Sequence, residues 1–381
     1  MTTTAFPIHV SPAQPGGPDL VAEIFTQPGP CASIYIPAES DRTGAIERHS
    51  LHASNAGRSI VDHGWSQQAA ENVRSALVGL GPHGGATSVV IASPERVLLT
   101  GHLADPYKAR VTVEELPDLA PVLDSASRTI PHVVVLADRS GADVFSVSAP
   151  GASATTTVHG DTEYIHRGHP GGWSQRRFQQ RAENTWEHNA SEVADEVRDA
   201  VKEIGAQLIV AAGDVRAIGF LRHALGSTAD LLVEVEGSRH TDADVIAPRV
   251  TDVVASAVAE RRAKRLAHLR DAIAGGLGSS STQDVLRALR RGAVDTLYIA
   301  PVPPGENTAF FSRTDPMLVA LKASELHDLA PADSVGSGSF ISAALRSALA
   351  QRSHIEMVPN AAVLGENHCA ATFRFDINTD T

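Results

Sequence analysis

The chain has 381 residues, of which 43% are hydrophobic and 20% are charged, and its formal net charge is −12. This composition is globular, excludes a disordered chain, and at this length predicts two or three domains. Net acidity argues against a protein that coats nucleic acid non-specifically. No apolar run approaches the roughly 20 residues that span a bilayer, and the first residues lack a secretory-signal pattern, so we expect a cytoplasmic protein without membrane contact.

Residues 1–128 predict an α/β domain. The apolar, β-branched stretch 31–37 is typical of a strand, and 44–64 predicts a helix that ends at a glycine. Two further strands, 87–93 and 96–103, are separated by Pro-Glu, which favours a hairpin. The proline-containing stretch 116–131 predicts a linker, and we therefore place a domain boundary after residue 128.

The second predicted domain, 129–275, opens with a strand, a tight turn and a second strand within 132–149. A polar loop is expected over 150–172. A long helix then starts near Ser174 and ends at Gly205, because apolar positions recur every three or four residues. These positions are Phe178, Ala182, Trp186, Ala190, Val193, Val197, Val201 and Ile204.

Strands at 206–214 and 230–237 continue this domain, and a second long helix is expected over 248–273. The alternation of strand and helix favours an α/β layer structure. The Gly/Ser-rich stretch 274–282 predicts a linker to the next domain.

The third predicted domain, 276–381, is also α/β. A helix followed by a strand is expected in 282–300 and again in 337–359. Residues 316–330 predict a helix, and 368–375 alternates like an edge strand.

A basic segment, 166–183, stands out against the acidic chain. It contains four arginines and two histidines around an adjacent pair of glycines. Paired glycines allow close backbone approach, and the free amides of a helix start, together with arginines, favour phosphate. The segment therefore predicts an RNA-facing loop tip, and a solvated surface loop is the alternative.

The sequence contains no metal or cofactor motif. The 17 histidines lack ligand spacing, and Cys31 and Cys369 form no CxxC pair, so neither a zinc site nor a disulfide scaffold is expected. The stretch "GSGS" (336–339) lacks the lysine of a phosphate loop and instead predicts a helix cap at Ser337 or Ser339.

Two further charged groups have both a functional and a structural interpretation. Asp138, Asp143 and Asp214 lie next to strands, where carboxylates can bind Mg²⁺ for nuclease chemistry, yet Asp is common in such turns. The basic run from Arg261 to Arg270 predicts either an RNA-backbone contact or a solvated helix face.

Residues 171–197 resemble the central domain of the archaeo-eukaryotic peptide-chain release factors. In that family a Gly-Gly-Gln tip is followed by a serine, an Arg-Phe pair and further arginines on a long helix. The matching residues, without a gap, are Gly171, Gly172, Ser174, Arg177 and Phe178. The similarity extends over residues 130–381, and the family has bacterial members that include ribosome hibernation factors of the Balon type.

The resemblance implies a fold and a place of action. The fold would have three α/β domains, with an RNase H-like central domain and a ribosomal-protein-like α/β C-terminal domain. The protein would enter the ribosomal A site and bring its Gly-Gly-Trp loop to the peptidyl-transferase centre, near P-site tRNA, with an elongation-factor-Tu-type GTPase as a candidate partner. The residues expected to contact ribosomal RNA are His166, Arg167, His169, Gly171, Gly172, Trp173, Ser174, Gln175, Arg176, Arg177 and Arg181.

Two departures from the family pattern bear on activity. Trp173 replaces the family's catalytic glutamine, and an indole, with one donor and no acceptor, cannot orient a water in the same way. Residues 1–128 also lack the family's Asn-Ile-Lys-Ser motif, so termination at stop codons is not expected. We therefore favour a hibernation or stress factor that blocks the site without hydrolysis.

Three alternatives stay open. The first is a peptidyl-tRNA hydrolase acting in ribosome rescue, with Gln175 as its catalytic residue. The second is an RNA-cleaving enzyme that uses the three aspartates. The third is an α/β protein with an unrelated small-molecule ligand.

Overall fold

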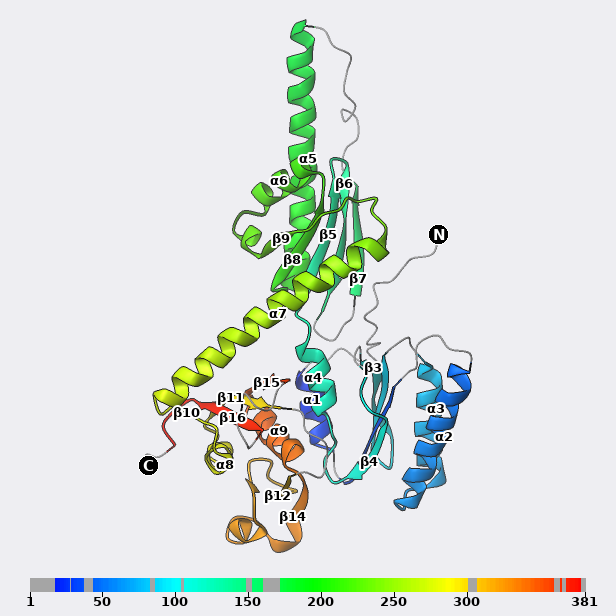
Figure 1. Ribbon diagram of the computed structural model, residues 1–381, viewed down its shortest axis with the longest axis vertical. Coiled ribbons are helices and arrows are strands. Elements are labelled where there is room, and N and C mark those ends of the chain that lie inside the picture. The colour runs from blue at the N-terminus through cyan, green and yellow to red at the C-terminus, as the bar shows by residue number, and fades with distance from the viewer. Residues whose placement is uncertain are drawn as a thin grey trace. The chain divides into compact units, whose positions relative to one another are not determined.

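A computed structural model describes residues 18–27, 29–37, 44–82, 86–103, 106–148, 153–159, 172–300, 307–359, 364 and 368–377. Side chains are described for these residues except 18–20, 153–155, 158, 159, 172–184 and 186. The described chain forms two compact units: unit 1 lies within Arg128–Arg261, and unit 2 lies within His9–Ser127 and Arg262–Thr381 (Figure 1).

Unit 1 contains a five-stranded sheet in the order β7-β6-β5-β8-β9. The strands β5 (His132–Asp138), β6 (Gly141–Val147) and β7 (Ser153–His159) form an antiparallel meander. The strands β8 (Leu208–Gly213) and β9 (Leu232–Glu234) extend the sheet parallel to β5. A meander extended by parallel strands is the RNase H-like arrangement that the resemblance implies.

Helices cover both faces of this sheet. The helices α5 (Gly172–Ile204) and α6 (Val215–Leu225) pack on one face, and α7 (Ala243–Ala274) packs on the other (Figure 1). Alternate residues of β5 and β8 point to opposite faces, as the period of two in a strand requires. A short 3-10 helix, η1 (Gly226–Leu231), connects α6 to β9. Gly205, at φ +63°, ends α5 as predicted.

The first sheet of unit 2 is antiparallel, in the order β3-β2-β1-β4. Its strands are β1 (Cys31–Pro37), β2 (Thr87–Ala92), β3 (Val97–Leu103) and β4 (Arg110–Glu114).

Two helices, α2 (Ala45–Asp62) and α3 (Gln67–Leu80), cover one face of this first sheet. The other face belongs to a larger core that also takes in α1 (Pro18–Phe25) and the start of α4 (Ala120–Ser127).

The second sheet of unit 2 has the order β10-β16-β11-β15. Its strands are β10 (Gly278–Ser279), β16 (Cys369–Phe373), β11 (Val294–Ile299) and β15 (His354–Met357).

A third, small sheet has the order β13-β12-β14, with strands β13 (Val319–Ala320), β12 (Thr308–Ser312) and β14 (Val335–Ser339). The helices α8 (Thr282–Arg290) and α9 (Phe340–Ala350) complete this part of unit 2.

One apolar core joins the sheets of unit 2. Tyr35 and Ile91 of the first sheet, Leu297 of the second and Phe311 of the third all belong to the same buried cluster. The α/β fold class is confirmed, whereas the division into three domains at 128 and 275 stays a prediction.

Two predicted loops of the middle region are wrong. The expected linker 116–131 contains α4, because Leu119 and Ala120 are buried in the core of unit 2. The expected loop 150–172 contains β7, whose polar, threonine-rich sequence gives no apolar alternation.

Other errors lie near the C-terminus. The expected helix over 316–330 is the short strand β13 followed by a 3-10 helix, η2 (Ala323–Leu326), because residues 319 and 320 pair with β12. The strand near 368–375 is not at an edge, since β16 lies between β10 and β11 and all its residues are buried. The expected linker 274–282 contains β10, which pairs with β16.

Candidate nucleic-acid interface and its support

The start of α5 extends beyond the sheet of unit 1 (Figure 1). The side-chain amide of Asn189 donates to the carbonyl oxygen of Arg139, in the turn between β5 and β6, at 3.0 Å. This contact marks the level of the sheet's edge along the helix. The residues before it, Gly172–His188, add about 25 Å of helix at 1.5 Å per residue. We call this part of α5 the overhang.

The predicted RNA-contacting residues divide into two groups. His166, Arg167, His169 and Gly171 lie outside the described residues. The others lie in the first turns of the overhang, where the backbone is helical and side chains are not described. These are Gly172, Trp173, Ser174, Gln175, Arg176, Arg177 and Arg181.

Charge along α5 runs against the helix dipole. The overhang holds three arginines and two glutamates, whereas residues 189–204 hold five acidic and two basic residues. The partial positive charge at a helix N-terminus favours anionic side chains there and cationic ones at the C-terminus. The reversed order costs helix stability, so a bound anion at the N-terminal end would have both the dipole and the arginines to bind it. The reversed charge order could have been found from the sequence by counting charged residues separately in the first and second halves of the predicted helix.

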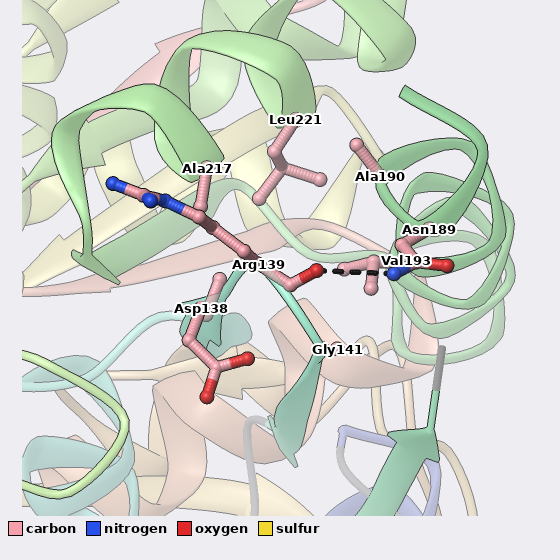
Figure 2. A pocket seen from close by; sticks show the side chains of 9 residues that line it. Asp138, Arg139, Gly141, Asn189, Ala190, Val193, Ala217 and Leu221 are labelled. Carbon is pink, nitrogen blue, oxygen red and sulfur yellow. Dashed lines mark hydrogen bonds between the residues drawn. The ribbon is translucent and has the colours of Figure 1, made fainter. Parts of the chain in front are cut away.

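At the edge of the sheet, the ion pair of Arg139 with Asp214 links the ends of β5 and β8, and Figure 2 shows Arg139 among the residues that line the neighbouring pocket. The Arg139 guanidinium contacts both carboxylate oxygens of Asp214, with Nη2 at 3.0 Å and Nε at 3.4 Å. Asp214 also caps α6, accepting from the amides of Arg216 and Ala217. Partial burial acts to raise the pKa of Asp214, but the Arg139 and backbone hydrogen bonds outweigh it and hold the pKa below its usual value.

A small cavity lies beside Arg139. It has a volume of about 10 Å³, enough for roughly one water, and is lined by the β5–β6 turn, α5 and α6. Open α/β sheets bind ligands outside the carboxyl ends of the strands, where the strand order reverses. In unit 1 that place lies between β5 and β8, and the Arg139–Asp214 ion pair lies there.

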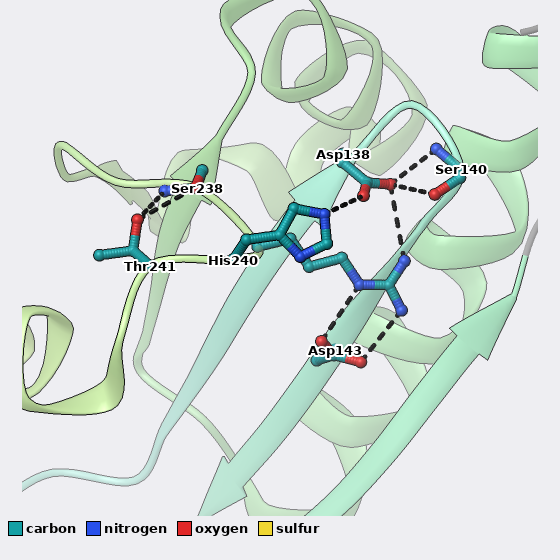
Figure 3. A network of polar contacts seen from close by, with 7 residues as sticks. Asp138, Ser140, Asp143, Ser238, His240 and Thr241 are labelled. Carbon is teal, nitrogen blue, oxygen red and sulfur yellow. Dashed lines mark hydrogen bonds and ion pairs between the residues drawn. The ribbon is translucent and has the colours of Figure 1, made fainter.

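A second arginine, Arg239, binds two aspartates at the same edge of the sheet, and Figure 3 shows the contacts around them. Arg239 donates to both oxygens of Asp143 at 3.1 Å and lies 3.5 Å from Asp138, with its side chain only 11% exposed. These hydrogen bonds, led by those to Asp143, raise the pKa of Arg239. His240 Nε2 lies 3.8 Å from the same Asp138 carboxylate.

The three aspartates of the nuclease hypothesis are thus not brought together as one set. Asp138 and Asp143 share Arg239, whereas Asp214 is held by Arg139. Among the described residues, no group of three or more histidine, cysteine, aspartate or glutamate side chains is placed to hold a metal ion.

The basic run on α7 is partly internal to unit 2. Arg265 Nε lies 3.2 Å from Glu356 Oε2, and Arg262 Nε lies 4.0 Å from Oε1 of the same carboxylate, whose side chain is 5% exposed. Lys264 and His268 are exposed. The spacing of the basic residues predicted an exposed helix face. It could not reveal the contact with Glu356, because β15 lies far from α7 in the sequence.

The "GSGS" stretch is β14 rather than a phosphate loop. Ser339 occupies the N-cap position of α9 without a side-chain capping bond, so the predicted cap is only positional. The glycines instead make room: a Cβ on Gly336 would collide with the carboxylate of Glu115 and lie 3.0 Å from Phe311. Glu115 in turn binds Arg313 through both carboxylate oxygens, at 2.6 and 2.9 Å.

In the part of the chain that the structure describes, no helix is both long and apolar enough to cross a bilayer.

Comparison with protein families gives a match to one family model. Bacterial archaeo-eukaryotic release factor family 2 matches residues 131–277, which include the Gly-Gly pair and α5. No curated protein sequence matches the chain.

Solved structures with similarity to the chain include three of interest. The archaeal translation termination factor aRF1 is 14% identical with a TM-score of 0.24, over 93% of this chain and 96% of that chain. Ribosome-bound archaeal Pelota, solved with ABCE1, is 13% identical with a TM-score of 0.41, over 94% of each chain. Dom34 of S. cerevisiae, described as interacting with Hbs1, is 10% identical with a TM-score of 0.38, over 77% of this chain and 82% of that chain.

These low identities and TM-scores transfer no activity to the chain. The family match is independent of them and agrees with the resemblance read from Gly171, Gly172, Ser174, Arg177 and Phe178. Residues 131–277 of the chain are thus similar to bacterial archaeo-eukaryotic release factor family 2.

Proposed function

We propose that the protein is a ribosome-binding translation factor of the cytoplasm. It occupies the A site, carries its Gly-Gly-Trp loop towards the peptidyl-transferase centre, and acts as a hibernation or stress factor without hydrolysing peptidyl-tRNA. An elongation-factor-Tu-type GTPase is the proposed partner for its delivery, since members of the family work with such GTPases.

The observation that carries this proposal is the overhang. It adds about 25 Å of helix beyond a rigid sheet, which suits insertion into a narrow, RNA-lined space. Its first turns hold three arginines on an acidic chain, so phosphate attraction is concentrated at one end. At the carboxyl ends of β5 and β8, where a sheet of this kind would bind a small ligand, Arg139 is paired with Asp214 and the pocket beside it holds about one water.

The absence of hydrolysis rests on Trp173, because an indole cannot accept a hydrogen bond from an attacking water. Gln175 is the candidate catalytic residue if hydrolysis occurs. It lies in the first turn of α5, in a backbone that is already helical, and not in the loop before it.

Co-sedimentation with vacant ribosomes through sucrose tests the proposal. We expect the protein to pellet at low salt and less at moderate salt, because binding to phosphate releases counterions. An Arg176→Glu/Arg177→Glu variant is expected to lose most of this pelleting. The matched control is Arg198→Glu on the same helix, which changes the same kind of charge on the part that covers the sheet.

Two outcomes decide between the hypotheses. Failure of the wild type to pellet, with and without a GTPase of the proposed class, would refute ribosome binding. Release of the peptide from peptidyl-tRNA on the ribosome, abolished by Gln175→Ala with pelleting intact, would establish the hydrolase instead.

A further inference from the structure

A small change in the direction of α5 at Asn189 produces a large displacement at the far end of the overhang. The overhang is about 25 Å long, so a swing of about 10° at the level of Asn189 moves its end by about 4 Å. Such a displacement exceeds the length of a hydrogen bond. The contacts that fix α5 where it leaves the sheet therefore decide where its first turn lies.

Asn189 is an unusual residue for its place. It is 2% exposed, beside Ala190 and Val193 on the apolar face of α5, where asparagine forms helix less well than leucine and its amide must be desolvated. Its amide is satisfied by the Arg139 carbonyl oxygen at 3.0 Å. A directional hydrogen bond defines the orientation of the helix more closely than apolar contact, which tolerates sliding.

The turn that receives this bond is itself held from α6. The Arg139 guanidinium binds Asp214, and Asp214 caps the first turn of α6. One residue thus accepts from α5 through its backbone and donates to the cap of α6 through its side chain.

The turn is held from a second direction as well. Asp138 accepts from the amide and the hydroxyl of Ser140, at 2.7 and 2.6 Å, which closes the turn (Figure 3). Arg239, from the loop before α7, binds Asp143 and approaches Asp138. Because the turn is fixed on both sides, it can serve as a fulcrum.

We infer that the turn Asp138–Gly141 and Asn189 form a fulcrum that sets the direction of the overhang. They are positioning residues: they act on the candidate RNA-contacting residues through the helix. Only the consequence for ribosome binding rests on the proposed function, whereas the direction of the helix can be measured on the free protein.

The test measures a distance by pulsed electron–electron double resonance on the full chain. Spin labels are placed at Gln179→Cys in the overhang and at His223→Cys, an exposed site on α6. The native Cys31 and Cys369 are buried, and burial raises the pKa of each thiol to about 11, so they remain unlabelled thiols in the folded protein. The chain without introduced cysteines checks this.

Asn189→Leu is the main variant, since it removes the donor and keeps the volume. We expect the distance distribution to widen or shift by about 3 Å, because Gln179 lies about 15 Å along the helix from Asn189 and a swing of about 10° moves it that far. The unfolding temperature is expected to hold, because leucine is apolar and forms helix better. Ser191→Leu, an exposed position two residues on, is the matched control and should leave the distance unchanged.

Asp214→Ser is the second variant, in case Asn189→Leu does not fold. Serine still caps α6, but it removes the charge that holds Arg139. We expect a smaller broadening with α6 intact.

The outcomes separate the fulcrum from the proposed function. The fulcrum would be overturned if the wild-type distance distribution were already broad. It would also be overturned if the variants gave a distance distribution as narrow as that of the wild type. A fall in unfolding temperature with an unchanged distance would make Asn189 merely structural and would overturn it too. A narrow wild-type distribution that widens in the variants, in a protein that never pellets with ribosomes, would support the fulcrum and refute the proposed function alone.

Discussion

Unit 1 and unit 2 use similar arginine–carboxylate pairs for different ends. In unit 1, Arg139 and Arg239 gather at one edge of a single sheet, around the turn from which the overhang departs. In unit 2, the Arg313–Glu115 pair joins the end of the first sheet to the small third sheet, 198 residues away in sequence. The comparison indicates that unit 1 is a platform for an extended helix, whereas unit 2 uses its polar contacts to make one body from distant segments.

The largest expected effect separates binding from stability. Arg176→Glu/Arg177→Glu should weaken ribosome binding by about ten- to a hundredfold at low salt, because each substitution removes a contact to RNA phosphate. The remaining binding should also depend less on salt, since fewer counterions are released. Neither unit should lose stability, since both positions lie in the overhang beyond the sheet. Pelleting as a function of salt measures the first, and thermal unfolding measures the second. Loss of binding together with unfolding of unit 1 would contradict this separation.

Substitution of one strand glycine in each unit compares how much stability each unit loses when a Cβ is added. A Cβ at Gly213 in unit 1 would collide with the carbonyl of Ala137, which is backbone, and would lie 3.2 Å from Ile218. A Cβ at Gly336 in unit 2 would instead displace the end of the Glu115 side chain. We expect Gly213→Ala to cost about 3 kcal/mol and Gly336→Ala about 1 kcal/mol, because a carboxylate can move and a paired strand cannot.

Hydrogen exchange read by mass spectrometry assigns each loss to its unit. Gly338→Ala is the control, since its nearest neighbour, at 3.6 Å, allows an ordinary contact. An equal loss of stability in Gly213→Ala and Gly336→Ala would mean that the Glu115–Arg313 pair yields no more easily than backbone.

The two bidentate arginines differ mainly in burial. The Arg239 side chain is 11% exposed and that of Arg313 is 46% exposed. Arg239→Met leaves carboxylates partly desolvated and should cost about 2 kcal/mol, less than for a fully buried pair. Arg313→Met should cost about 0.5 kcal/mol, as for surface pairs. Urea unfolding of the two variants provides the comparison, and a larger loss for Arg313→Met would reverse our ranking of the pairs.

The smallest expected effect is a difference in acid response. Burial lowers the pKa of His132 in unit 1, so its unfolded form takes up a proton first, and stability is lost as pH falls through about 6.5. The lowered pKa of Asp214 adds a further loss as pH falls through that folded-state value. In unit 2, burial raises the pKa of Glu114 and of Asp118, so the folded form binds protons more tightly and stability rises as pH falls through the raised values.

Unit 1 should therefore lose protection against hydrogen exchange between pH 7 and pH 5, relative to unit 2 and after correction for intrinsic rates. His132→Leu removes the titrating group and should flatten the response of unit 1 in this interval. An acid response confined to unit 2 would show that other groups dominate.

The sequence predicted best where one apolar period runs undisturbed. The strand 31–37, the pair within 132–149 and the described part of the α5 stripe, from Ala190 on, all follow this rule. It failed where polarity or small residues hide the period: β7 is rich in threonine, and the buried face of α3, which was not predicted, includes Ala69 and Ala70.

The candidate site was predicted from Gly171, Gly172 and the arginines and stays a prediction, whereas the contacts that support α5 could not be predicted from the sequence. Arg239 and Asp143 lie 96 residues apart, and Asn189 and Arg139 lie 50 apart. Neither pair belongs to a local pattern, because loops and helices of unknown course separate the partners. The sequence indicates the end of the overhang, and only the fold reveals the contacts that hold its base.

The ion pair of Arg139 with Asp214 has a practical consequence for anyone who wishes to inhibit this protein. In unit 1 this ion pair lies where open α/β sheets bind ligands, and the pocket beside Arg139 has room for about one water. A compound designed for that position would first have to evict an ion pair. Under the proposed function, an antagonist is better patterned on the overhang itself, as a short basic helix that competes for the ribosome.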